Sequence, residues 1–278
     1  MSFPDPQPKA LFFDVFGTCV DWRTTVTDAL QSACSQALNR ASSSIATRIR
    51  MKTDTLSKQD WGNIAQEWRN SYLKFTRSIA SDPSIPYKTV DQHHLDSLRE
   101  ILVKHELIFP RQGDVPADLV HDGSLFDEQD LVALSMIWHK LAPWPDTVQG
   151  LSMLNKKFST VTLSNGNVSL LKDMVEHGGM PFTDIYSAEM FQSYKPSPKV
   201  YLGAAEKKRL QPAECMMVAA HLDDLEHAKQ NGFRTLYVER LQEERHPELL
   251  DEGIPDVWVK LGEDGFVEAA RKLGISIA

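Results

Sequence analysis

The chain is short of cysteine, with only Cys19, Cys34 and Cys215 among its 278 residues. Their odd number and wide spacing fit neither a disulfide framework nor a metal-binding cluster, and few dispersed cysteines are typical of a reducing compartment. The N-terminal segment 4–8 is polar and rich in proline, unlike a secretory signal peptide. The expected location is therefore the cytoplasm.

Long apolar runs and an excess of basic residues are also missing. No apolar run approaches the roughly 20 residues that a membrane-spanning helix needs. Lys and Arg number 30 against 38 Asp and Glu, which gives a formal net charge of −8. This balance argues against nucleic acid or an anionic membrane as the main partner. It allows a small anionic substrate, because a pocket can be locally basic on an acidic protein.

Hydrophobic residues make up 42% of the chain, enough to build one large or two ordinary domains. After a strand at 10–16, apolar residues fall at helical spacing, and from about residue 150 strand signals alternate with helical ones. This alternation predicts an α/β fold, a doubly wound, mostly parallel, Rossmann-like sheet with an inserted helical cap domain. The predicted domains are a disordered lead-in at 1–9, a core domain at 10–21 and 146–278, and a helical cap at 22–145.

The expected elements are these. Cap helices are predicted at 25–38, 61–79, 90–107 and 127–141, with loops at 41–52 and 109–123. Core strands are predicted at 159–163, 185–187, 216–220, 234–238 and 257–259, and core helices at 167–177, 198–209 and 222–231.

The first strand ends on an acid. Three apolar residues lead into Asp14, and Gly17-Thr18 then breaks the strand. In open α/β sheets, ligands bind at the carboxyl ends of the strands, so an acid there is a candidate nucleophile or metal ligand. An isolated Asp could equally cap a turn.

Three later stretches also follow strand candidates and argue against a simple turn. They are Ser164-Asn165-Gly166-Asn167, Ser193-Tyr194-Lys195-Pro196 and His221-Leu222-Asp223-Asp224. The carboxyl ends of parallel strands share one edge of the sheet, so the sequence predicts that these polar groups gather around Asp14.

These stretches resemble the four motifs of the haloacid dehalogenase superfamily. The matching segments are Phe13-Asp14-Val15-Phe16-Gly17-Thr18, Leu163-Ser164-Asn165-Gly166, Tyr194-Lys195-Pro196 and Asp223-Asp224. The resemblance covers about residues 9–260 and implies a doubly wound core with a cap inserted after the first strand.

Two positions depart from the phosphatases of that superfamily. Their second Asp, which protonates a leaving alkoxide, is replaced by Phe16, and a halide leaves without needing such an acid. The acid that ligates Mg²⁺ at the end of their fourth strand is replaced by Ala220. The resemblance therefore implies a reaction without metal or cofactor.

Other residues resemble the type II 2-haloacid dehalogenase branch. They are Val20-Asp21-Trp22-Arg23, the pair Trp68-Arg69, and Tyr201 six residues after Lys195. The roles that this resemblance implies are as follows: Asp14 is the nucleophile and Thr18 orients it; Ser164 and Lys195 hold the substrate carboxylate; Arg69 and Asn165 cradle the halide; Asp224 positions Lys195 or the hydrolytic water; Phe16 and Tyr201 line the substrate.

One site residue has two open interpretations. Well-known relatives carry Ser-Ser-Asn where this chain has Ala219-Ala220-His221. His221 is therefore either a polar capping residue or a water-activating base, and we include it among the catalytic candidates. Tyr201 could also be a packing residue.

The predicted reaction is hydrolysis of a small 2-haloacid through an aspartyl ester, with inversion at C2, giving a 2-hydroxy acid and halide. The alternatives are a Mg²⁺-dependent phosphatase of the same superfamily and a non-catalytic member that binds a small anion or a partner. A homodimer is left open. His93-His94 with Asp91 and Asp96 resemble a metal cluster, but their expected place on a solvated helix face favours a structural role.

Overall fold

The computed structural model describes residues 6–40, 44–82, 84–110 and 123–276. The chain groups into two compact units. The first comprises Met1–Asp21, Thr76–Tyr87 and Leu141–Ala278, and the second comprises Trp22–Phe75 and Lys88–Lys140.

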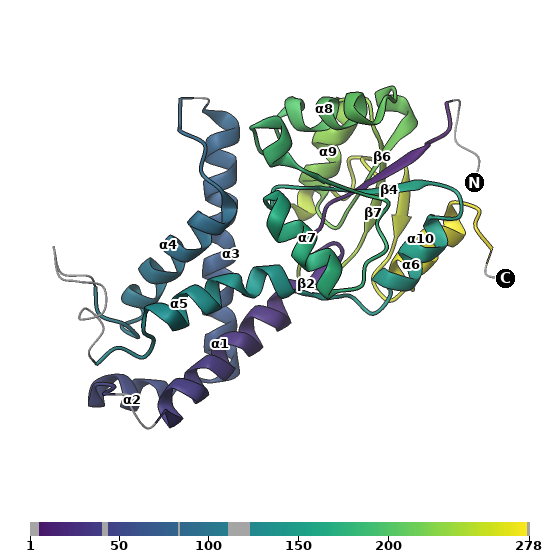
Figure 1. The fold of residues 1–278 in the computed structure, drawn as a ribbon. Helices are drawn as coiled ribbons and strands as arrows, with labels where there is room; N and C mark the ends of the chain where they lie inside the picture. The colour runs from purple at the N-terminus through teal and green to yellow at the C-terminus, as the bar shows by residue number, and fades with distance from the viewer. Residues whose placement is uncertain (1–5, 41–43, 83, 111–122, 277–278) are drawn as a thin grey trace. The chain divides into compact units, whose positions relative to one another are not determined.

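A six-stranded parallel sheet forms the centre of the first unit (Figure 1). In spatial order its strands are β5 (Asp184–Ser187), β4 (Ser159–Ser164), β1 (Ala10–Phe13), β6 (Cys215–Ala219), β7 (Arg234–Val238) and β8 (Val257–Val259). The chain runs outward from β1 to β4 and β5, then returns to the other side of β1 for β6. This reversal beside β1 is the switch in strand order at which open α/β sheets bind ligands. The predicted doubly wound α/β fold is confirmed.

Helices cover both faces of this sheet (Figure 1). They are α6 (Thr147–Leu154), α7 (Val168–His177) and α10 (Gly265–Lys272) on one face, and α8 (Pro198–Lys208) and α9 (Leu222–Gln230) on the other. Helix α6 packs so closely on α10 that a Cβ added to Gly150 would come within 2.3 Å of the Cβ of Phe266. All four residues of β1 are fully buried, as expected for a strand covered on both faces.

The register of β1 brings the motif segments together. Phe13 lies opposite Thr162 of β4 and Val218 of β6. The residues that follow each strand therefore emerge at the same edge of the sheet. Strand β1 ends at Phe13, earlier than the predicted 10–16, although the Asp14 N–H still donates to the carbonyl of Val218 at 3.0 Å.

The second unit is helical. It contains α1 (Trp22–Asn39), α2 (Thr47–Thr53), the larger part of α3 (Lys58–Ser81), α4 (Val90–Lys104), α5 (Glu128–Ser135) and the 3₁₀ helix η1 (Met136–Lys140). Helices α4 and α5 begin with capping boxes at Thr89 and Asp127, in which each cap side chain accepts from a backbone N–H three residues on. The core of this unit contains four buried tryptophans: Trp22, Trp61, Trp68 and Trp138.

Several local predictions differ from the structure. The predicted loop 41–52 contains most of α2, whose apolar Ile49 is buried despite weak periodicity in the surrounding sequence. In the predicted disordered lead-in, Lys9 bonds through its backbone to Glu214 and Ser159, while residues 1–5 lie outside the described part. Most of the predicted loop 109–123 also lies outside it.

The predicted cap, 22–145, is longer than the second unit. Residues 76–87 and 141–145 group with the first unit instead. Part of the reason is the small β-sheet of the first unit, in which β2 (Val20–Asp21) pairs with β3 (Ala142–Pro143). Helices α6 and α10 and this small sheet have no counterpart in the predicted elements.

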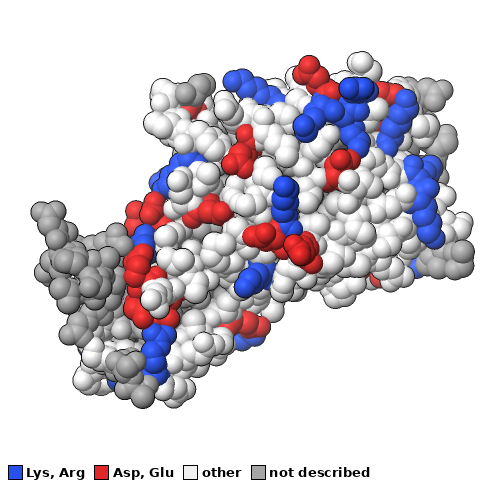
Figure 2. All heavy atoms as spheres, viewed as in Figure 1, with Lys and Arg blue, Asp and Glu red and all other residues white. Residues whose placement is uncertain are grey.

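The described residues contain no helix that is long and apolar enough to cross a membrane. On the face drawn in Figure 2, Lys and Arg side chains are interspersed with Asp and Glu. No single-sign surface of the kind that binds nucleic acid dominates that face.

Candidate active site

Asp14 lies directly after β1 and is the centre of a buried polar cluster. Its Oδ1 accepts a hydrogen bond from Lys195 Nζ at 3.0 Å, and its Oδ2 accepts one from Thr18 Oγ1 at 2.9 Å. His221 Nδ1 lies 3.2 Å from the same Oδ2. Burial acts to raise the pKa of Asp14, but Lys195 and His221 outweigh it and hold the pKa well below its usual range. The carboxylate is therefore ionised, as a nucleophile must be.

The loop after Asp14 fixes the orientation of Thr18. The Thr18 hydroxyl oxygen accepts from the backbone N–H of Ala220 at 2.9 Å, which leaves its proton directed at Asp14. The orienting role of Thr18 stays a prediction, which these contacts support. Ala220, where the phosphatases carry a metal ligand, contributes this backbone contact.

Lys195 lies between two carboxylates. Its Nζ is 3.0 Å from Asp14 Oδ1 and 2.5 Å from Asp224 Oδ2. Burial acts to lower the pKa of Lys195, but the two carboxylates outweigh it and raise the pKa above its usual range. A permanent positive charge is thus held beside the nucleophile.

Asn165 and Tyr201 hold this ion cluster in place. The side chain of Asn165 bonds to both backbone groups of Lys195, accepting from its N–H at 2.7 Å and donating to its carbonyl at 3.1 Å. The Tyr201 hydroxyl donates to Asp224 Oδ1 at 2.7 Å, and Tyr201 is fully buried. Burial raises the pKa values of both Asp224 and Tyr201. Tyr201 is therefore placed to orient Asp224, and its predicted place lining the substrate stays a prediction.

Two other predicted residues are enclosed near this cluster. Ser164, the last residue of β4, is fully buried, and its Oγ accepts from the Gly166 N–H at 3.3 Å. The ring of Phe16 packs against Gly166 and is also buried. Their predicted roles in holding the substrate stay predictions.

His221 joins Asp14 to a residue that the sequence did not predict. Its Nε2 lies 3.2 Å from Glu243 Oε2, and all three side chains are buried. Burial acts to lower the pKa of His221, but the hydrogen bonds with Asp14 and Glu243 outweigh it and raise the pKa to about 9. The imidazole is therefore charged at neutral pH. The available signal for Glu243 was its place in the loop that follows a core strand at the carboxyl edge of the sheet.

In the second unit, Arg69 lies among aromatic rings. Its guanidinium carbon is 4.7 Å from the ring centre of Tyr72 and 5.7 Å from that of Trp22, and the side chain is buried. The neighbouring Trp68 Nε1–H donates to the carbonyl of His94 at 3.0 Å. These contacts fix the arginine that the resemblance assigns to the halide.

The histidine pair of the second unit differs from its predicted solvated position. His94 is fully buried against Trp138, and His93 stacks on Phe75. Among the described residues, no group of three or more His, Cys, Asp or Glu side chains is arranged to hold a metal ion.

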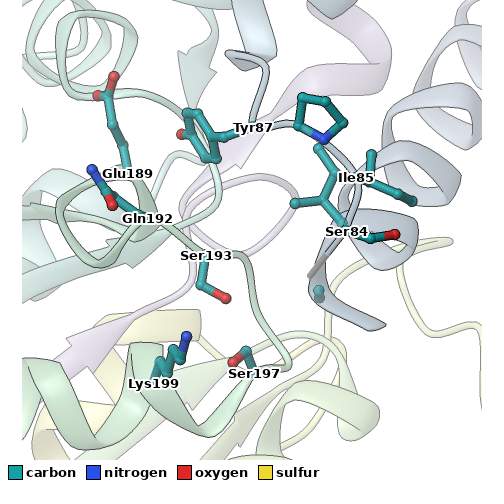
Figure 3. Close-up of a pocket in the computed structure, with 11 residues that line it drawn as sticks. Ser84, Ile85, Tyr87, Glu189, Gln192, Ser193, Ser197 and Lys199 are labelled. Atoms are coloured by element: carbon teal, nitrogen blue, oxygen red, sulfur yellow. The ribbon is translucent and has the colours of Figure 1, made fainter. Parts of the chain in front are cut away.

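A cavity of about 600 Å³ lies in the first unit and is lined in part by the segment from Gln192 to Lys199 (Figure 3). Ser193 and Ser197, which flank Lys195, line it together with Tyr87 and Glu189. The side chain of Lys195 does not line this cavity and bonds to Asp14 instead. This cavity is therefore separate from the Asp14 cluster.

A family model, individual relatives and solved structures are all similar to this chain, and they agree with the site around Asp14. The family model described as haloacid dehalogenase-like hydrolase matches residues 8–232. The chain is 31% identical to (S)-2-haloacid dehalogenase 1 of Pseudomonas sp. (strain CBS-3) over 107 residues, 37% of this chain and 47% of the relative. It is also 31% identical to (S)-2-haloacid dehalogenase of Xanthobacter autotrophicus over 120 residues, 42% of this chain and 47% of the relative. The matched segments span about half the length of these relatives.

Solved structures resemble the chain along almost its whole length. A crystal structure described as a defluorinating L-2-haloacid dehalogenase has a TM-score of 0.76 and 29% identity, covering 96% of this chain and 95% of the other. Another, described as an L-2-haloacid dehalogenase, has a TM-score of 0.73 and 29% identity, covering 96% and 98%. The superfamily predicted from the four motifs is confirmed, and the chain belongs to the haloacid dehalogenase-like hydrolases.

Proposed function

We propose that this protein hydrolyses the carbon–halogen bond of small 2-haloacids through a covalent ester on Asp14. The observation that carries the proposal is the Asp14 carboxylate, ionised in a buried cluster with Lys195, Thr18 and His221. Phe16 occupies the position from which an acid would protonate an alkoxide, so the site is suited to a leaving group that departs as a stable anion.

In the first step, one oxygen of Asp14 attacks C2 in line with the halogen, and the halide leaves with the bonding electron pair. The Thr18 hydroxyl and His221 Nδ1 both lie within hydrogen-bond distance of Oδ2, and Lys195 Nζ donates to Oδ1. We propose that Oδ1 attacks, because Thr18 and His221 both hold Oδ2. The displacement inverts C2.

The substrate carboxylate needs a cation, and the halide needs donors. Lys195 supplies a fixed positive charge beside Asp14, and the resemblance supplies Ser164 for the same carboxylate. Arg69 and Asn165 are proposed for the halide. Preorganised donors aimed at charge that develops in the transition state typically contribute ~3–4 kcal/mol each.

In the second step, water attacks the Cγ atom of the Asp14 ester. The bond between Cγ and the former Oδ1 breaks, and the 2-hydroxy acid leaves. C2 does not react in this step, so the inversion of the first step is kept. Asp224 holds Lys195 through both steps, since it shares the ammonium group with Asp14.

The test is a halide-release assay on chloro-, bromo- and fluoroacetate and on both enantiomers of 2-chloropropionate, with and without EDTA. Fluoroacetate is included because one structural relative is described as defluorinating. We expect halide release that EDTA leaves unchanged and that Asp14→Asn abolishes. Release of phosphate from phosphate monoesters that EDTA abolishes, without halide release from any haloacid, would contradict the proposal.

The proposal includes a cytoplasmic location, which is supported by the three cysteines, all free and buried. It leaves open whether the chain forms a homodimer, and light scattering of the purified chain tests this.

A further inference from the structure

The Oδ2 atom of Asp14 has the surroundings of an oxyanion-binding site. The Thr18 hydroxyl donates to it at 2.9 Å, and the Nδ1 atom of His221 lies 3.2 Å away. The Thr18 hydroxyl oxygen accepts from the Ala220 N–H, and this contact leaves the hydroxyl proton directed at Oδ2 of Asp14. Two donors therefore converge on Oδ2, the oxygen that does not attack in the proposed mechanism.

Glu243 fixes the second donor. Its Oε2 lies 3.2 Å from His221 Nε2, so the imidazole lies between two carboxylates, and both of its nitrogens act as donors. The loop that carries Glu243 approaches Gly17 so closely that a Cβ there would lie 2.0 Å from Oε2. Gly17 also has a φ of +83°, which L side chains rarely adopt. The loop after Asp14 and the loop that carries Glu243 therefore pack directly against each other at Gly17.

We propose that Thr18 and His221 form the oxyanion hole for hydrolysis of the Asp14 ester, and that Glu243 is the positioning residue that holds His221 there. This inference rests on the proposed function. It assigns a donor role to His221, distinct from both a capping residue and a water-activating base.

The chemistry balances as follows. The water oxygen bonds to Cγ, and the electron pair of the carbonyl moves onto Oδ2, where Thr18 and His221 stabilise the charge. The pair then returns, the bond from Cγ to the former Oδ1 breaks, and one water proton ends on that oxygen as the 2-hydroxy acid leaves. The second water proton goes to solvent, which restores the carboxylate. Asp14 now carries the water oxygen.

The charge on His221 depends on the groups that face it. Asp14 and Glu243 favour the imidazolium, Arg245 opposes it, and Asp223 on α9 is a further nearby carboxylate. The pKa of His221 is about 9 beside the Asp14 carboxylate, and esterification lowers it because it removes that negative charge. A donor role requires the proton, so ester hydrolysis falls as pH rises through that lowered pKa. A base role would give the opposite slope.

The experiment is rapid-quench single turnover of 2-chloropropionate, with chloride and the ester on intact protein measured separately. We compare the natural chain with His221→Ala, His221→Asn and Glu243→Gln, each checked for folding by circular dichroism. His177→Ala, at the exposed end of α7, is the matched histidine control.

We expect His221→Ala to release chloride, accumulate the ester and hydrolyse it roughly 10²–10³-fold more slowly, as for loss of one oxyanion donor. His221→Asn keeps a side-chain N–H but cannot act as a base, so it should recover much of the rate. Glu243→Gln should give an intermediate rate, with the fall at high pH moved to lower pH. His177→Ala should match the natural chain.

Two results would overturn the oxyanion hole. One is ester hydrolysis by His221→Ala at the natural rate. The other is a His221→Asn variant as slow as His221→Ala, together with a natural rate that rises with pH, which indicates a base. Absence of both chloride and ester in the natural chain would instead overturn the proposed function itself.

Discussion

Two buried histidines, one in each unit, have opposite surroundings. His221 lies between the carboxylates of Asp14 and Glu243, and its pKa is raised to about 9. His94 is enclosed by rings, with the centre of Trp138 4.6 Å away, and among the described residues neither of its nitrogens has a hydrogen-bonding partner. Burial, with smaller contributions from His93, Arg69 and His139, holds the pKa of His94 well below its usual range.

The comparison shows that burial alone does not decide whether an imidazole is charged. Burial opposes the charge in both cases, and only acceptors placed at both nitrogens outweigh it. The cluster in the first unit therefore consists of paired ions. The cluster in the second unit is an aromatic enclosure around a neutral imidazole. Removing a member should cost much in the first and little in the second.

The largest effect is expected at the centre of the charged cluster. Asp14→Asn removes the nucleophile and leaves Lys195 and His221 without one of their carboxylates, so halide release should fall below detection. The measurement is chloride release from 2-chloropropionate. Asp173→Asn, on the exposed side of α7, is the matched control and should keep full activity. Turnover by Asp14→Asn without deamidation would remove the basis of the mechanism.

Asp146→Ala extends the comparison to a second set of paired charges in the first unit. Arg240 donates to both Asp146 oxygens, at 2.6 and 2.8 Å, and its Nε donates to the carbonyl of Thr18. Removing one partner of a buried pair leaves an uncompensated charge, so the free energy of unfolding should fall by about 3–5 kcal/mol. Urea denaturation measures this.

The double variant Asp146→Leu with Arg240→Met sharpens that result. It removes both charges together, and apolar replacement of a buried pair is often nearly neutral. We expect a smaller loss than for Asp146→Ala alone. An equal or larger loss would mean that packing around the pair, and not its charge, decides the stability.

The raised pKa of His221 makes a prediction about pH and stability. A group whose pKa is higher in the folded state stabilises fully below its unfolded pKa and loses that contribution as pH rises through the folded pKa. The free energy of unfolding should therefore fall between about pH 6.5 and pH 9. In His221→Asn this slope should be flatter when unfolding is followed across the same range. Equal slopes would show that the imidazole is not charged in the folded state.

In the second unit, Arg69 is the residue with an expected effect on catalysis. Its guanidinium packs over Tyr72 and Trp22, so its position is fixed before substrate binds. Arg69→Ala should lower kcat/KM for halide release roughly 10²-fold or more, as for loss of a preorganised donor. Arg69→Lys keeps the charge and should lose less. An unchanged kcat/KM in Arg69→Ala would exclude it from the halide site.

Most residues of the Asp14 cluster that were found from sequence lie in segments that follow core strands at the same edge of the sheet. Asp14 directly follows β1, Lys195 and Asp224 lie in the segments after β5 and β6, and the structure brings their side chains into one cluster. Because parallel strands end at the same edge of the sheet, the order of strands and polar segments in the sequence was enough to predict that these side chains meet. The alternation of strand and helix signals thus predicted the sheet, and the four motifs predicted most of the residues in the cluster.

Glu243 could not be found in the same way. It reaches His221 only because the loop after β7 folds back onto Gly17, and a run of charged residues after a strand does not specify that path. Helix α2 was missed for a related reason, since its sequence has weak periodicity and its burial depends on the packing of the second unit. Contacts made through loop paths and tertiary packing are not encoded in local spacing.

The smallest effect is expected at His94. Its ring is enclosed by Trp138, Trp68 and Tyr72, and its two nitrogens lost their water contacts on burial without gaining a partner among the described residues. Leucine fills a similar volume without polar atoms, and replacing an unpaired buried polar group can be neutral or stabilising. His94→Leu should therefore change the free energy of unfolding by no more than about 1 kcal/mol, in either direction. His221→Leu, measured beside it, should cost more, because it leaves the buried Glu243 carboxylate without its imidazolium. A larger loss from His94→Leu than from His221→Leu would reverse the comparison, and would place a hidden polar contact inside the aromatic cluster.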